Sequence, residues 1–139
     1  MKKIISIILI IFPLAAMSQE TSISAFLIKW ENSKNYLTEI AEAMPETSYS
    51  YKPSERQMSF EEQLLHIQKN MNWLATTYFN QPKPSETSNK LTKNELISYL
   101  NTSFEAVAEA VKSCPENELA QKVDFFAGPK TKLQILNLL

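Results

Sequence analysis

The sequence predicts an all-α protein, an antiparallel up-and-down bundle of four helices whose fourth helix is cut short. Four segments repeat apolar residues at helical spacing. The chain contains one glycine, Gly128, whereas all-β folds need many glycines for tight turns. Its 139 residues, 44% hydrophobic and 21% charged, are typical of one globular domain.

The first 18 residues have the layout of a secretory signal peptide. Two lysines precede an apolar run over residues 4–16, and Ala16-Met17-Ser18 places small residues at the −3 and −1 positions of a cleavage site. At roughly 1.5 Å per residue, the apolar run reaches about 20 Å, short of the ~30 Å hydrocarbon core of a membrane. We therefore expect a periplasmic or secreted domain of residues 19–139, with no stable membrane anchor after cleavage.

The first helix is expected over residues 22–44, because apolar residues recur at helical spacing there and Pro45 follows them. Lys34 interrupts the apolar stripe, so one end of this helix is expected to be less buried. Residues 45–58 are expected to form an extended connection, since prolines, serines and tyrosines are frequent in them.

The second helix, residues 59–80, has the clearest start. The Ser59 hydroxyl can cap it while Glu62 reaches back to the Ser59 amide, which makes a capping box. Residues 81–90 then form a polar loop. An apolar stripe with spacings of four and three follows the cap and predicts the buried face: Phe60, Leu64, Ile67, Met71, Leu74 and Tyr78.

The third helix is expected over residues 92–114, with a second capping box at Thr92 and Glu95. A connection over residues 115–128 follows, and Pro129 is expected at the first helical position of a fourth helix, residues 129–139. The sequence stops about three turns into that helix. The chain is therefore expected to be a fragment, a marginal fold or a fold that a partner completes.

Charge and residue types exclude several classes of function. Removal of the two signal-peptide lysines leaves 12 basic residues against 15 acidic ones, a net charge of −3, so we expect no nucleic-acid binding. The single cysteine, Cys114, rules out an internal disulfide framework and is expected to be a packing residue. One glycine cannot build a Gly-rich phosphate loop, and one histidine provides no second imidazole for acid–base catalysis.

The region from Trp30 to His66 resembles the start of the DinB family of metal-binding helical bundles. Residues 130–139 resemble the beginning of that family's last core helix, and the likeness covers most of residues 26–139. The matching residues in the first region are Trp30, Tyr36-Leu37, Ala43-Met44-Pro45, Tyr51-Lys52-Pro53, Gln57-Met58-Ser59-Phe60 and Glu62-Gln63-Leu64-Leu65-His66-Ile67.

The resemblance implies a bundle that often carries a divalent metal, zinc or nickel, on three histidines. One of the three matches His66. The others come from a His-x-x-x-His pair that would fall just beyond Leu139, so we expect an incomplete site with metal absent or weakly bound. Some related proteins transfer low-molecular-weight thiols, which implies a small-molecule thiol substrate.

His66 is the only histidine in the chain. At about 100° per residue, it lies roughly 120° from the apolar stripe of its helix, and Glu62 shares its side one turn earlier. A Glu-x-x-x-His pair on one helix face can bind a metal, or it can be an ordinary exposed pair.

Two functions therefore stay open. The first is a secreted, divalent-metal-dependent enzyme of the thiol-transferase or hydrolase-like type. The second is a non-catalytic bundle remnant or binding module without metal. The sequence leaves the catalytic residues unknown, and a homodimer is compatible with either function.

Overall fold

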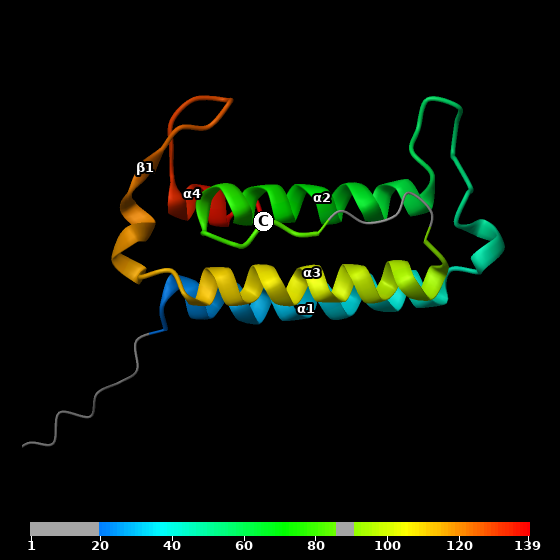
Figure 1. Ribbon diagram of the computed structural model, residues 1–139, viewed down its shortest axis with the longest axis horizontal. Helices are drawn as coiled ribbons and strands as arrows, with labels where there is room; N and C mark the ends of the chain where they lie inside the picture. The colour runs from blue at the N-terminus through cyan, green and yellow to red at the C-terminus, as the bar shows by residue number, and fades with distance from the viewer. Residues whose placement is uncertain (1–19, 86–90) are drawn as a thin grey trace, which may run out of the picture.

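The computed structural model describes residues 20–85 and 91–139. Its main elements are four helices, α1 (Ser22–Ala43), α2 (Phe60–Tyr78), α3 (Lys93–Lys112) and α4 (Lys132–Leu136). Between them lie two 3₁₀ turns, η1 (Glu46–Ser48) and η2 (Glu116–Ala120), and two short strands, β1 (Lys122–Val123) and β2 (Lys130–Thr131) (Figure 1). The prediction of a mostly helical chain with four helices is confirmed, and the bounds of the first three agree within about two residues.

Capping side chains fix where the helices begin. The Ser59 amide donates to Glu62 Oε2 at 2.7 Å and the Glu62 amide donates to Ser59 Oγ at 3.1 Å, so the predicted capping box of α2 is present. Thr92 and Glu95 make the same pair of bonds at the start of α3. These boxes satisfy amides that the first turn of a helix leaves without partners.

Helix α3 lies between α1 and α2 and packs against both. The ammonium of Lys93, the first residue of α3, donates hydrogen bonds to the carbonyls of Glu42 and Met44 at the end of α1. The start of α3 therefore lies beside the end of α1, and the two helices are antiparallel. In contrast, Phe79 at the end of α2 and Ser113 at the end of α3 line one cavity. Helices α2 and α3 are therefore parallel (Figure 1).

The parallel pair shows that the predicted up-and-down order was wrong. That order assumes short connections, which make neighbouring helices antiparallel. Residues 79–92 separate α2 from α3, and a connection of this length can extend about 46 Å at ~3.3 Å per residue. The 20-residue helix α3 is only about 30 Å long at ~1.5 Å per residue, so the connection can return along the whole bundle.

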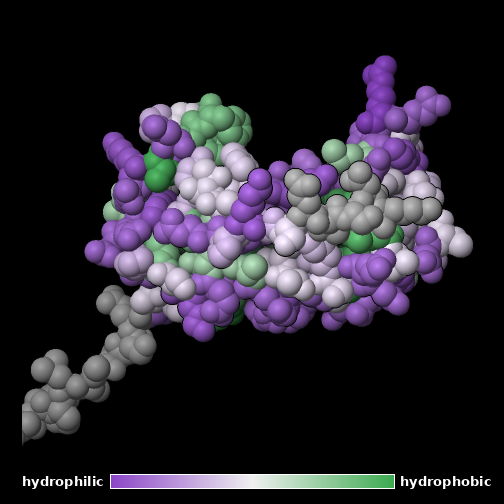
Figure 2. Space-filling model, in the orientation of Figure 1, coloured by the Kyte–Doolittle hydropathy of each residue, from purple (hydrophilic) through white to green (hydrophobic). Residues whose placement is uncertain are grey.

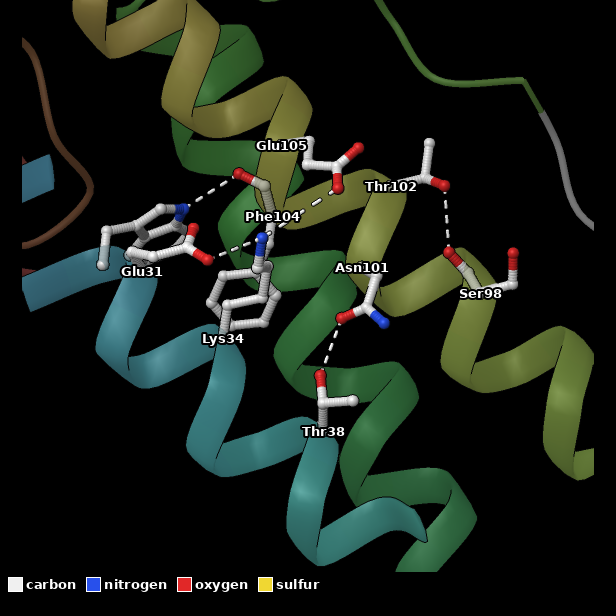
Figure 3. A network of polar contacts seen from close by, with 9 residues as sticks. Glu31, Lys34, Thr38, Ser98, Asn101, Thr102, Phe104 and Glu105 are labelled. Atoms are coloured by element: carbon white, nitrogen blue, oxygen red, sulfur yellow. Dashed lines mark hydrogen bonds and ion pairs between the residues drawn. The ribbon is translucent and has the colours of Figure 1, made fainter. Parts of the chain in front are cut away.

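A polar ladder lies along one edge of the α1–α3 interface (Figure 3). Thr38 Oγ1 lies 2.7 Å from Asn101 Oδ1, and the Lys34 ammonium pairs with Glu31 at 2.9 Å and lies 4.0 Å from Glu105. Lys34 thus lies on the side of α1 that faces α3, where its charge interrupts the apolar stripe and is paired with glutamates at the edge of the interface. Beneath the ladder, Trp30 is 4% exposed and donates its indole N–H to the Phe104 carbonyl at 2.9 Å.

The α2–α3 interface contains a buried polar layer. Gln68 and Asn72 of α2 both donate their amide N–H groups to Ser103 Oγ of α3, at 3.1 and 3.2 Å. Gln81, just after α2, donates to Asn72 Oδ1 at 2.9 Å. All four side chains are buried, so these bonds offset the cost of removing amides from water.

The fourth helix begins later than predicted. Strands β1 and β2 pair antiparallel as a hairpin, and Gly128, at φ 97°, lies in its turn where an L side chain would be strained. The helix starts after Thr131, whose hydroxyl accepts from the Gln134 amide at 3.2 Å. Pro129 therefore belongs to the hairpin rather than to the first helical turn.

Aromatic side chains of the hairpin pack against the outer face of α2. Phe125 and Phe126 have ring centroids 6.0 and 6.2 Å from Trp73, and the Tyr78 hydroxyl donates to the Asp124 carbonyl. Phe126 remains 84% exposed, and Figure 2 shows apolar surface gathered on the hairpin. Within residues 20–85 and 91–139, no helix is both long and apolar enough to cross a membrane.

Candidate metal centre

His66 lies on the second turn of α2 with its side chain exposed to solvent. Its Nε2 atom is 3.0 Å from the Nδ2 atom of Asn70, one turn later on the same helix. Helical periodicity predicts that His66 lies away from the buried face of α2, and the structure confirms this position. An exposed imidazole whose one hydrogen-bond partner among the described residues is Asn70 can reach a ligand without any rearrangement of the core.

Glu62 lies one turn before His66, but other groups hold its carboxylate. Its Oε2 atom accepts from the Ser59 amide at 2.7 Å and pairs with the Lys52 ammonium at 2.9 Å. The bond from the Ser59 amide, followed by Lys52, lowers the pKa of Glu62 below its ordinary value. A metal would therefore have to compete with the helix cap and with a cation for this oxygen.

The surface around His66 is a shallow hollow of about 220 Å³. Glu62 and His66 line it together with Met58, Leu65 and Lys69. Since Lys69 lines the hollow and Lys52 contacts Glu62, two ammonium groups accompany one carboxylate. This balance of charge opposes the approach of a divalent cation.

An apolar groove between α1 and α2 runs beside His66. It has a volume of about 410 Å³ and is lined by Trp30 and Leu37 of α1, by Ile67 and Leu74 of α2 and by Leu139, among others. Ile67 is 38% exposed, so its predicted place in the core was wrong. The reason is that α1 and α2 both pack on α3 and leave their facing sides apart.

The described residues do not make a zinc or nickel centre by themselves. Tight zinc sites in proteins use three or four nitrogen, sulfur or oxygen ligands in tetrahedral geometry. Within residues 20–85 and 91–139, no group of three or more His, Cys, Asp or Glu side chains is placed to hold a metal ion. His66 supplies one exposed imidazole, and Glu62 supplies one carboxylate that is already bound to an amide and an ammonium.

The described residues thus form a helical bundle in which α3 is central and one exposed imidazole lies on α2. The model of the DinB family matches residues 17–139, and the chain therefore belongs to the DinB family. A crystal structure of a DinB-like protein from Bacillus subtilis has a similar fold, with a TM-score of 0.66 and 24% sequence identity over 82% of this chain and 78% of that one. No curated protein matches the chain in sequence.

Two features near the candidate site do not follow from the apolar periodicity of the sequence. The contact between Glu62 and Lys52 joins a helix to the preceding connection, and no periodicity describes residues outside a helix. The buried amides of Gln68 and Asn72 lie four residues apart, beside the apolar stripe. That spacing on the inner side of α2 was a signal for an interhelical polar layer.

Proposed function

We propose that this DinB-family protein is exported and that His66 contributes one ligand to a divalent-metal site whose other ligands lie outside the described residues. The observation that carries the proposal is the position of His66. It is exposed on α2, next to Ile67 and Asn70, which line the open groove between α1 and α2. A helix placed in that groove could bring further ligands toward the imidazole.

The completed site would act on a small-molecule thiol, the substrate class that the resemblance implies. A metal bound there would supply a Lewis acid that favours the thiolate over the thiol. In the residues at hand, His66 offers one nitrogen and Asn70 lies 3.0 Å from it. The role of this chain in such a site is to present the imidazole from a rigid helix.

A second function, a binding bundle without metal, is favoured by the surroundings of Glu62. Its carboxylate is held by Ser59 and Lys52, and Lys69 lines the same hollow. These contacts stabilise the start of α2 and need no metal. In this second function, His66 is an exposed helix residue and the groove between α1 and α2 is the binding surface.

Calorimetric titration of residues 19–139 with zinc or nickel tests the proposal. One imidazole without a pre-formed ligand set should bind weakly, with a dissociation constant above about 1 µM. His66→Ala should remove this binding but leave the urea unfolding curve unchanged, because the side chain is exposed. Asn70→Ala is the matched control, since it removes the neighbouring amide and leaves the imidazole.

An extended chain provides the second arm of the test. A helix bearing His-x-x-x-His, added after Leu139, should give tight binding and a metal-dependent rise in melting temperature, because a ligand bound only by the folded state stabilises it. Tight one-to-one binding by the 139-residue monomer would contradict the proposal. Equal weak binding by the wild type and His66→Ala would favour the bundle without metal.

A further inference from the structure

A second cavity lies where α2 and α3 both end, about 20 Å along α2 from His66 at ~1.5 Å per residue. Its volume is about 340 Å³, within the range of roughly 300–1,000 Å³ that small-molecule sites occupy. Apolar side chains form much of its wall, among them Phe79, Ala106 and Ala110. Its distance from His66 makes it independent of the metal proposal.

An ion pair between a buried lysine and a half-exposed glutamate forms part of the cavity wall. Lys132 and Glu118 both line the cavity, and Lys132 Nζ lies 2.6 Å from Glu118 Oε2. Lys132 is only 8% exposed, although lysine is rarely buried without strong compensation. An ammonium has three N–H donors, and Glu118 is its one acceptor among the described residues.

The remaining polar groups around the cavity are uncharged or paired. Burial raises the pKa of the Cys114 thiol above its ordinary value, so the thiol is neutral at pH 7. Asn80, an uncharged residue with a left-handed backbone at φ 57°, also lines the cavity. Glu109 lies at the rim and pairs with Lys112 at 3.7 Å.

We propose that this cavity binds a small uncharged molecule with an apolar body and a carbonyl-type oxygen, as in an amide, ester or lactone. The apolar wall accommodates the body of the molecule. The oxygen accepts from the Lys132 ammonium, which has N–H groups beyond the one that Glu118 takes. Beside this neutral pair, a carboxylate would meet repulsion from Glu118 as well as attraction from Lys132, and an amine would meet the reverse. Neither charge therefore gains a net attraction that offsets its loss of hydration.

A structural ion pair alone does not account for the arrangement. The contact between Lys132 and Glu118 does join α4 to η2. A pair with only that role needs no hollow beside it. Here the pair borders a cavity of about 340 Å³, which leaves room for a ligand beside the ammonium.

The single cysteine makes the proposal testable. In the metal-free mature protein, the rate of Cys114 alkylation by N-ethylmaleimide is measured with hexanamide, hexanoate or hexylamine added at equal concentrations. Hexanamide at twice its dissociation constant should slow alkylation about threefold, because two-thirds of the cavities are then occupied. Hexanoate and hexylamine should protect less at the same concentration.

Two variants separate binding from indirect effects. Ala110→Leu fills the cavity and should remove the protection by hexanamide. The control is Ala43→Leu, which should keep the protection because Ala43 is exposed at the opposite end of the bundle. Lys132→Met should weaken the protection while leaving the stem of the side chain in place. Amide chemical-shift changes on addition of hexanamide, confined to the lining residues, provide a readout that does not depend on the thiol. Equal protection by all three probes, or protection that persists in Ala110→Leu, would overturn the proposal.

Discussion

The carboxylates of Glu62 and Glu95 make the stability of two helix starts depend on pH. Bonds from the Ser59 amide and from the Thr92 amide, respectively, are the main reason that the pKa of each lies below its ordinary value. The ionised form is therefore favoured by folding, and its contribution is fully present at pH values above the unfolded pKa, which is about 4.5, and begins to decline near that value. It is lost as the pH falls through the lowered pKa of the folded state.

We therefore expect the free energy of unfolding to fall between pH 5 and pH 3, and to fall less in the double variant Glu62→Gln/Glu95→Gln. Glutamine keeps an acceptor for the cap but does not titrate. Urea unfolding at a series of pH values measures the difference. At the start of α4, Gln134 accepts the hydrogen bond from the amide of the capping residue, and glutamine does not titrate. That cap should therefore not respond to pH. Identical pH profiles for the wild type and the double variant would contradict the assignment.

Ser103 is the acceptor on which the polar layer between α2 and α3 depends. Ser103→Ala removes the oxygen that receives N–H groups from Gln68 and Asn72. Since both amides are buried, we expect a loss of about 1–3 kcal/mol in the free energy of unfolding. Ser98→Ala, at an exposed position of the same helix, should change it by less than about 0.5 kcal/mol. Comparable losses in both variants, measured by urea unfolding, would argue against the layer.

At the scale of elements, the hairpin before α4 depends on one glycine. Gly128 has φ 97°, and no atom lies within 4 Å of the position that a Cβ would take. Gly128→Ala would therefore cause no clash but would strain the backbone by about 1–2 kcal/mol. We expect a loss of that order in the free energy of unfolding. The exposed neighbour provides the control, since Ala127→Ser should have little effect. An unchanged stability in Gly128→Ala would mean that the hairpin tolerates another turn.

The start of a helix could be predicted from the sequence where it depends on residues that are near one another along the chain. The start of α2 follows from Ser59 and Glu62, which lie three residues apart and cap each other. The start of α4 was misplaced, because Lys130 and Thr131 have partners in β1 that no neighbouring residue reveals. The side of α2 that carries His66 followed from helical geometry, whereas the Lys52 contact of Glu62 depends on how the preceding connection folds back.

At the scale of the whole molecule, the proposed export is open to a direct measurement. We expect cleavage after Ser18, so that the mature chain begins at Gln19. The basic, apolar and small-residue order of residues 1–18 motivates this expectation. The intact mass of the protein recovered from its native cell reports the N-terminus. A mass that retains residues 1–18 would contradict both the cleavage site and the export of a free domain.

The central position of α3 constrains the order in which the chain can acquire structure. Helices α1 and α2 are made first, yet each packs mainly on α3 and their mutual contact is sparse. The bond from Trp30 to Phe104 spans 74 positions in sequence. During synthesis, the first two helices therefore lack their main packing partner until α3 has emerged. The bundle should then assemble late and in one cooperative step, at a rate limited by closure of long loops rather than by formation of single helices.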